Sequence, residues 1–100
     1  MRDQKKLTYI IQRFLKTEEW PSLLGIIANW ENETLNITFF FEKRITENLK
    51  ENASVLATEI LAQYPDGFLK EDYVQADPSQ PLPNSSFWVY KRADLMKMDL

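Results

Sequence analysis

The sequence predicts a small α+β domain in which an antiparallel sheet of about four strands packs against two main helices. Apolar residues recur at helical spacing in two separate segments, and they alternate along residues 24–41, between these segments. The chain has 100 residues, of which 44% are hydrophobic and 13% aromatic, enough for one packed core. We therefore expect residues 1–100 to form a single domain with the order helix, two strands, helix, two strands.

The first helix is predicted over about residues 3–17. Its apolar stripe consists of Leu7, Ile10, Ile11, Phe14 and Leu15. These spacings place the five side chains on one side of a helix. Asp3 is a suitable N-cap, because its carboxylate can accept hydrogen bonds from the first turn. The helix is expected to end before Pro21, because the residue before a proline disfavours helical geometry.

Residues 24–41 predict a β-hairpin, because apolar residues alternate on both sides of a polar loop at residues 31–34. The predicted pairs are Trp30 with Leu35, Ala28 with Ile37, Ile26 with Phe39, and Leu24 with Phe41. Every pair on that face is apolar, and a slip of one residue would separate all four. The other face is mixed in polarity, so we expect it to be partly solvated.

A second helix is predicted to start at the N-cap Thr46 and to end at the sequence Pro65-Asp66-Gly67. Its apolar stripe consists of Leu49, Ala53, Leu56, Ala57, Ile60, Leu61 and Tyr64. Short strands are expected at residues 73–76 and 87–90, joined by a stiff proline-rich connection. The tail after Arg92 is expected either to add a helical turn or to fray.

The composition excludes most familiar catalytic chemistry. The chain has no cysteine and no histidine, so it lacks disulfides, thiolate and imidazole metal ligands, and the commonest general base. Its only two glycines, Gly25 and Gly67, are too far apart in sequence to form a phosphate-binding loop. Carboxylates remain as catalytic candidates, but they would have to converge in a cleft with shifted pKa values. We therefore predict a non-enzymatic protein with no cofactor and no metal site.

Charge is distributed unevenly along the chain. Lys and Arg number 12 against 15 Asp and Glu, a formal net charge of −3. Acidic residues concentrate in residues 18–36 and 65–77, whereas residues 1–17 are strongly basic. An acidic surface with aromatic side chains suits a cationic protein partner such as a nuclease; alternatively, the acids only keep the protein soluble. The candidate partner-binding residues are Glu31, Glu33, Asp66, Glu71, Asp72 and Asp77, with Tyr73 and Trp88 as aromatic anchors.

Two other functions are open from the residues alone. Lys5, Lys6, Arg13 and Lys16 on the first helix are suited to phosphate contacts, although a net acidic chain is a poor general nucleic-acid binder. The aromatic strand at residues 87–90 is suited to a homodimer or to an adaptor subunit that packs on a neighbour. The chain shows neither the apolar run of a signal peptide nor that of a membrane span, which predicts a cytoplasmic protein with no membrane partner.

The segments between residues 37 and 92 resemble a known group of proteins. They read ITFFFEKRI, then ENASVLATEILAQYPDG, then EDYVQAD, then a proline-rich link and SSFWVYKR. This order resembles small immunity proteins of bacterial polymorphic toxin systems, of the contact-dependent inhibition and colicin kind. The resemblance implies a cytosolic, non-enzymatic protein that binds a cognate toxin domain, often a nuclease, and covers its active site or bars its substrate. It supplies no catalytic residues and transfers no interface residue by position.

Overall fold

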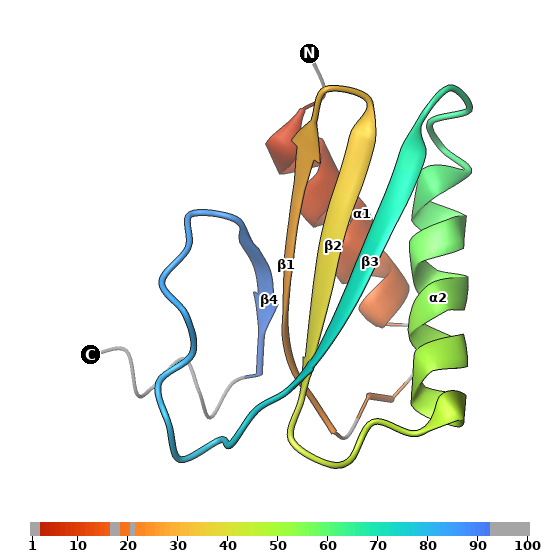
Figure 1. The fold of residues 1–100 in the computed structure, drawn as a ribbon. Helices are drawn as coiled ribbons and strands as arrows, with labels where there is room; N and C mark the ends of the chain where they lie inside the picture. Colours follow the sequence, from red (N-terminus) through yellow and green to blue (C-terminus); the bar gives the residue numbers. More distant parts are fainter. Residues whose placement is uncertain (1–2, 17–18, 21, 93–100) are drawn as a thin grey trace.

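Two helices and four strands form in the order that the apolar spacing predicts (Figure 1). The computed structural model describes residues 3–16, 19–20 and 22–92. Its elements are α1 (Gln4–Leu15), β1 (Leu23–Glu31), β2 (Thr34–Phe41), α2 (Glu47–Leu61), β3 (Phe68–Gln75) and β4 (Trp88–Lys91). The α+β class and the order of elements are confirmed. The expectation for the tail after Arg92 falls outside the described residues.

The strands form one mixed sheet in the order β3-β2-β1-β4. β1 pairs antiparallel with both β2 and β4, as expected, but β3 pairs parallel with β2. The expectation of a wholly antiparallel sheet is therefore wrong at this one pair. α2 connects β2 to β3 across one face of the sheet, and such a crossover returns the chain in the direction of the first strand.

β3 is also longer than the sequence predicts, because it begins at Phe68 and not near residue 73. Its middle carries the three charged residues 70–72, which interrupt the apolar alternation. An edge strand tolerates such charges, since only one of its sides pairs with a described strand and its side chains are only partly buried.

Both helices lie on the same face of the sheet (Figure 1), and the main core fills the space between the helices and the sheet. α1 packs against β4 and β1, and α2 packs against β3 and β2. Two glutamine side chains tie α1 to the sheet: Gln4 Nε2 donates to the carbonyl of Ala28 at 2.8 Å, and Gln12 Nε2 donates to that of Val89 at 3.0 Å. The fully buried side chains of the largest volume include Phe39, Phe41, Leu7, Ile11 and Leu23.

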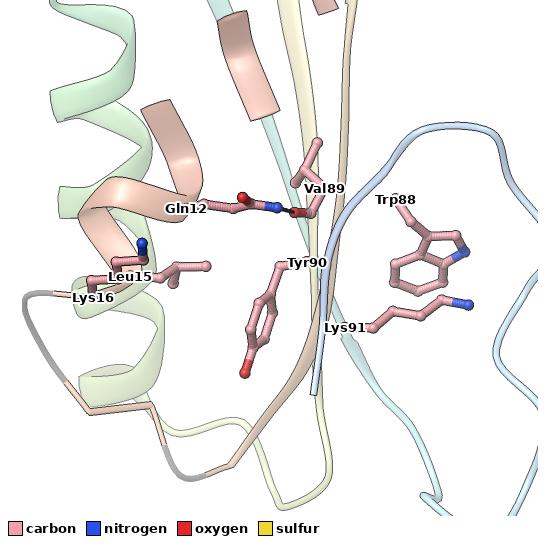
Figure 2. A pocket seen from close by; sticks show the side chains of 7 residues that line it. All are labelled: Gln12, Leu15, Lys16, Trp88, Val89, Tyr90 and Lys91. Carbon is pink, nitrogen blue, oxygen red and sulfur yellow. Dashed lines mark hydrogen bonds between the residues drawn. The ribbon is translucent and has the colours of Figure 1, made fainter. Parts of the chain in front are cut away.

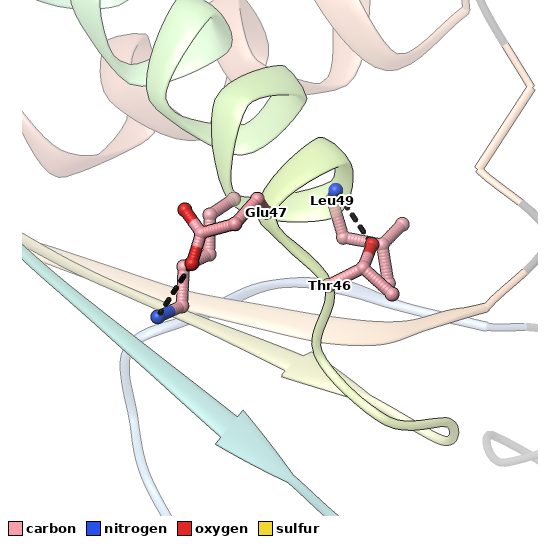
Figure 3. Close-up of polar contacts among 4 residues, drawn as sticks. Thr46, Glu47 and Leu49 are labelled. Atoms are coloured by element: carbon pink, nitrogen blue, oxygen red, sulfur yellow. Dashed lines mark hydrogen bonds and ion pairs between the residues drawn. The ribbon is translucent and has the colours of Figure 1, made fainter.

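Both predicted N-caps are confirmed. The Asp3 carboxylate accepts the backbone N–H of Lys5 at 2.9 Å, and the Thr46 hydroxyl accepts that of Leu49 at 3.1 Å (Figure 3). Each cap satisfies a donor that has no partner inside the helix. Glu47 and Lys50 form an exposed ion pair at 4.0 Å beside the second cap, a type of contact that adds little stability.

The hairpin register is confirmed for three of the four predicted apolar pairs, those of Trp30, Ala28 and Ile26. The fourth is wrong: Leu23, not Leu24, lies opposite Phe41, because a bulge interrupts the register at this point. A bulge adds one residue to a strand, so the residues beyond it exchange faces. Leu23 therefore takes the place on the helix-covered face that was expected for Leu24, and Leu24 lies on the opposite face. The turn is also tighter than predicted. Glu31 pairs with Thr34, and Asn32 between them has a φ of 57°, a left-handed conformation that asparagine tolerates.

The bulge gives the side of the sheet opposite α1 and α2, here called the open face, a small core of its own. Leu24 and Phe40 are buried there. Ile27, Ala76, Leu82 and Trp88 pack over them. The Trp88 ring lies so close to Gly25 that a Cβ on this glycine would come within 2.7 Å of it. The proline-rich connection thus covers the half of the open face nearest β4, and Trp88 Nε1 holds it by donating to the Pro83 carbonyl at 3.0 Å.

Candidate partner-binding surface

The other half of the open face carries mainly polar side chains in rows that run across β1, β2 and β3. The pairing of the strands defines these rows, because partners in adjacent strands point to the same side. From the hairpin turn inward, the rows are Glu31, Thr34 and Phe68, then Asn29, Asn36 and Lys70, then Ile27, Thr38 and Asp72. Asparagine is unfavourable within strands. Two asparagines side by side in the central strands therefore indicate a face that is not shaped by packing.

Three acidic residues from two separate parts of the sequence lie at one end of this face. Glu31 and Glu33 belong to the hairpin turn, and Asp66 lies in the connection from α2 to β3. The Phe68 N–H donates to the Glu33 carbonyl at 2.8 Å, which holds that connection against the turn. In Figure 1 both loops lie at the upper end of the sheet. All three carboxylates are exposed. We call Glu31, Glu33 and Asp66 the acidic end.

Phe68 is a candidate binding residue that the sequence analysis missed. Its side chain is 68% exposed, although it is a large aromatic at the start of a strand. It shares the first row with Glu31, next to the acidic end. The alternation of Leu69, Glu71 and Tyr73 on one side could have revealed it, because extending this alternation back to residue 68 places Phe68 on the polar side with Lys70 and Asp72.

Glu71 and Tyr73, two of the residues predicted for binding, point from β3 toward α2. The Tyr73 hydroxyl donates to Glu71 Oε1 at 2.8 Å, and the Ser54 hydroxyl of α2 donates to Glu71 Oε2 at 3.3 Å. The Tyr73 ring stacks on Phe39 with centroids 5.8 Å apart. Burial, together with the hydrogen bond to the Glu71 carboxylate and its charge, raises the pKa of Tyr73 to about 12. Tyr73 therefore contributes to the packing of β3 as well as offering a partly exposed edge.

The raised pKa of Tyr73 predicts a loss of stability in strong base. The folded state favours the protonated phenol, so its contribution is complete below pH 10, the ordinary pKa, and is lost as the pH rises toward 12. We expect Tyr73→Phe to lower the free energy of unfolding by about 1–2 kcal/mol at pH 8, because a hydrogen bond to a carboxylate is lost. The difference from wild type should shrink between pH 10 and pH 12 in urea titrations. A constant difference would contradict this account.

The last two predicted residues lie away from the acidic end. Asp77 follows the opposite end of β3, where its carboxylate accepts the Ser79 N–H at 2.9 Å and the Ser79 hydroxyl at 2.7 Å. These two hydrogen bonds lower the pKa of Asp77. Trp88 packs on Phe40 with centroids 5.2 Å apart, and the Lys91 ammonium lies 5.1 Å from its ring centroid. Of the eight residues, the structure brings together Glu31, Glu33 and Asp66, with Asp72 on the same face.

A pocket of about 450 Å³ lies between α1 and β4 (Figure 2). Its described lining residues are Gln12, Leu15, Lys16, Trp88, Val89, Tyr90 and Lys91. Figure 2 shows the Tyr90 ring on the α1 side of the strand and Trp88 and Lys91 on the other side. The charged groups of this lining are two lysines, so the carboxylates considered from the sequence do not converge here. Nor does the part of the chain that the structure describes contain a cluster of three acids arranged to hold a metal ion.

The fold and the open face define a small binding domain, with its core on one side of a sheet and an accessible polar surface on the other. A family model described as MafI2 immunity protein matches residues 4–94. The chain therefore belongs to the MafI2 immunity protein family, and the resemblance to small bacterial immunity proteins of polymorphic toxin systems is confirmed. No curated protein matches the chain.

Family membership gives the function in outline: an immunity protein protects against a cognate toxin, which is its partner. The match spans all six helices and strands, so the acidic end and the open face lie within the matched region. Neither of the two helices among residues 3–16, 19–20 and 22–92 has the length and apolar character of a membrane span.

Proposed function

We propose that this protein acts in the cytoplasm by binding a cationic toxin domain, a nuclease, and covering the surface with which the toxin holds nucleic acid. It does so without catalysis of its own. The observation that carries the proposal is that the two loops bearing Glu31, Glu33 and Asp66 are held together next to the exposed Phe68, on the side of the sheet opposite the two described helices. The acidic end would replace the phosphates that the toxin otherwise binds.

Electrostatics and packing support this use of the surface. A nuclease grips phosphates with Lys and Arg, so an acidic patch speeds its encounter with the inhibitor and fixes their orientation. Asp72 extends the negative surface along the open face. Lys70, which lies between Phe68 and Asp72 on β3, adds one positive charge, so a partner with a complementary charge pattern is favoured over others. Phe68 supplies an aromatic anchor surrounded by charges, the arrangement typical of binding hot spots. Asp77 and Trp88 lie outside this surface, and a role for them in binding stays a prediction.

A matched pair of variants tests the acidic end. The double variant Glu31→Gln with Glu33→Gln and the single variant Glu19→Lys both change the net charge from −3 to −1. Glu19 is an exposed residue between α1 and β1. We expect the double variant to weaken the Kd for the cognate toxin domain by about tenfold, because two charge pairs are lost, and the control by less than about twofold.

The measurements are calorimetric titration at low and high salt, and growth of cells that co-express the toxin. The double variant should also show a weaker dependence of Kd on salt than the wild type, since fewer charges participate. Equal affinity and equal protection for the double variant and the control would show that the acidic end is not the interface.

A further inference from the structure

β3 forms one edge of the sheet, and no described residue pairs with its outer side. Two hydrogen bonds fix which of its backbone groups face β2: Phe68 N–H donates to the Glu33 carbonyl and Ala76 N–H to the Phe41 carbonyl, both at 2.8 Å. Backbone groups of successive strand residues point to opposite sides. The N–H and C=O groups of the alternate residues therefore point outward. These residues are Leu69, Glu71, Tyr73 and Gln75.

A groove lies along α2 beside this edge. Its volume is about 450 Å³, and its lining residues are Glu51, Ser54, Val55, Thr58 and Glu59. Val55 is 57% exposed, so an apolar side chain is accessible on this surface together with two acidic residues. The hydrogen bond from Ser54 to Glu71 joins the groove to β3. Figure 1 shows α2 beside the upper part of β3, while the two elements diverge toward the lower end of the sheet. A strand added to β3 would lie over this groove.

We propose that an extended segment of the toxin adds to β3 as a fifth strand, with basic side chains directed toward α2. This inference rests on the proposed function, because it places the same toxin on the surface next to the acidic end. Main-chain hydrogen bonds to the four outward residues provide affinity, and the side chains on either face provide specificity.

The charges beside the edge define the chemistry of the segment. On the α2 side, alternate residues of the added strand face Glu51, Glu59 and Glu71, which favours Lys or Arg there. The other residues of the added strand point to the open face. Those beside Phe68 and Val74, near the two ends of β3, are expected to be apolar. The segment therefore carries basic side chains toward α2 and apolar side chains at the two ends of its open-face side.

A second copy of this chain suits the edge less well than a single strand. Antiparallel self-pairing that matches Lys70 with Asp72 of the other copy would set two Glu71 carboxylates opposite each other, and like charges in that position are destabilising. Because α2 packs against β3, a second copy paired at this edge would also bring its own acidic α2 surface beside the first. A lone toxin strand avoids both conflicts.

Amide hydrogen exchange of the ¹⁵N-labelled protein, alone and with the inactivated toxin domain, tests the proposal directly. In the free protein the amides of the four outward residues should exchange fast, whereas those of Lys70, Asp72 and Val74, which face β2, should be protected. The complex should slow the outward amides by about tenfold or more. Unchanged exchange of these amides in a formed complex would overturn the proposal, as would a dimer of the free protein that already protects them.

Glu71→Pro and Glu71→Ala form a matched pair, because both remove the carboxylate but only proline removes the outward N–H. Proline is tolerated on an edge strand where its nitrogen faces outward. We expect Glu71→Pro to bind the toxin domain about tenfold more weakly than Glu71→Ala, and equal affinities of the folded variants would contradict strand addition. If Glu71→Pro does not fold, the exchange experiment on the wild-type protein decides.

The two proposals fail separately. If Glu31→Gln with Glu33→Gln binds as the wild type does while the outward amides become protected, the acidic end is not the interface and strand addition stands. If that double variant weakens binding but the outward amides of the wild-type complex stay unprotected, strand addition alone is wrong.

Discussion

Phe39→Ala is expected to lower the free energy of unfolding by about 3–5 kcal/mol, a large part of the total stability of a domain of this size. Phe39 is fully buried on the helix-covered face of β2. Its ring stacks on Tyr73 at 5.8 Å and on Phe41 at 6.4 Å, measured between centroids. Removing the ring loses these contacts and leaves a cavity that neighbouring strands cannot close, because β2 is held on both sides by other strands.

Urea titration followed by circular dichroism measures this effect. Thr38→Ala is the control, since Thr38 is the neighbouring residue on the same strand and points to the open face, where it is only partly buried. Its substitution should change the free energy of unfolding by no more than about 1 kcal/mol. A loss below about 1 kcal/mol for Phe39→Ala would show that Phe39 does not support the core as described.

Phe68→Ala is expected to give the opposite result: binding of the toxin domain weakened by about 30-fold or more, with a change in stability of no more than about 0.5 kcal/mol. Phe68 is 68% exposed, so its ring contributes little to the folded state. At the toxin interface the same ring would be covered, and truncation of a covered aromatic anchor typically costs about 2 kcal/mol or more.

Tyr9→Ala provides the matched control, because Tyr9 is 61% exposed on α1 and lies outside both proposed binding surfaces. Both variants remove an exposed aromatic ring, so they differ mainly in the place from which it is removed. Calorimetric Kd values for the two variants, with thermal melts to confirm folding, test the assignment. If both bind as tightly as the wild type, Phe68 is not an anchor.

The hairpin register could be predicted from the sequence because alternation places one residue in every two on the same face. The bulge could not be predicted, because Leu23 and Leu24 are both leucines and either fits opposite Phe41. The full extent of β3, and with it the parallel pairing to β2, could not be predicted from the apolar pattern either. Charged residues interrupt the apolar pattern of this strand, so only its second half resembled a strand in sequence.

The candidate surface was predictable in part. The acidic character of the two segments was evident from the residues, but their meeting at one end depends on the parallel pairing that places Phe68 beside Thr34. Without that pairing, Asp66 and Glu33 have no reason to be neighbours. The position of Glu71 between β3 and α2 depends in the same way on where the helix crosses the sheet.

The displaced leucine in β1 divides the open face into two regions that differ in how freely they can evolve. Leu24 fixes the region near β4 beneath the proline-rich connection, so substitutions there disturb packing. The region near the hairpin turn supports no such packing, and replacing its exposed side chains should be close to neutral for folding. Related proteins can therefore change their charge pattern in the region near the hairpin turn without losing the fold. Such changes would allow them to bind toxins whose own surfaces have diverged.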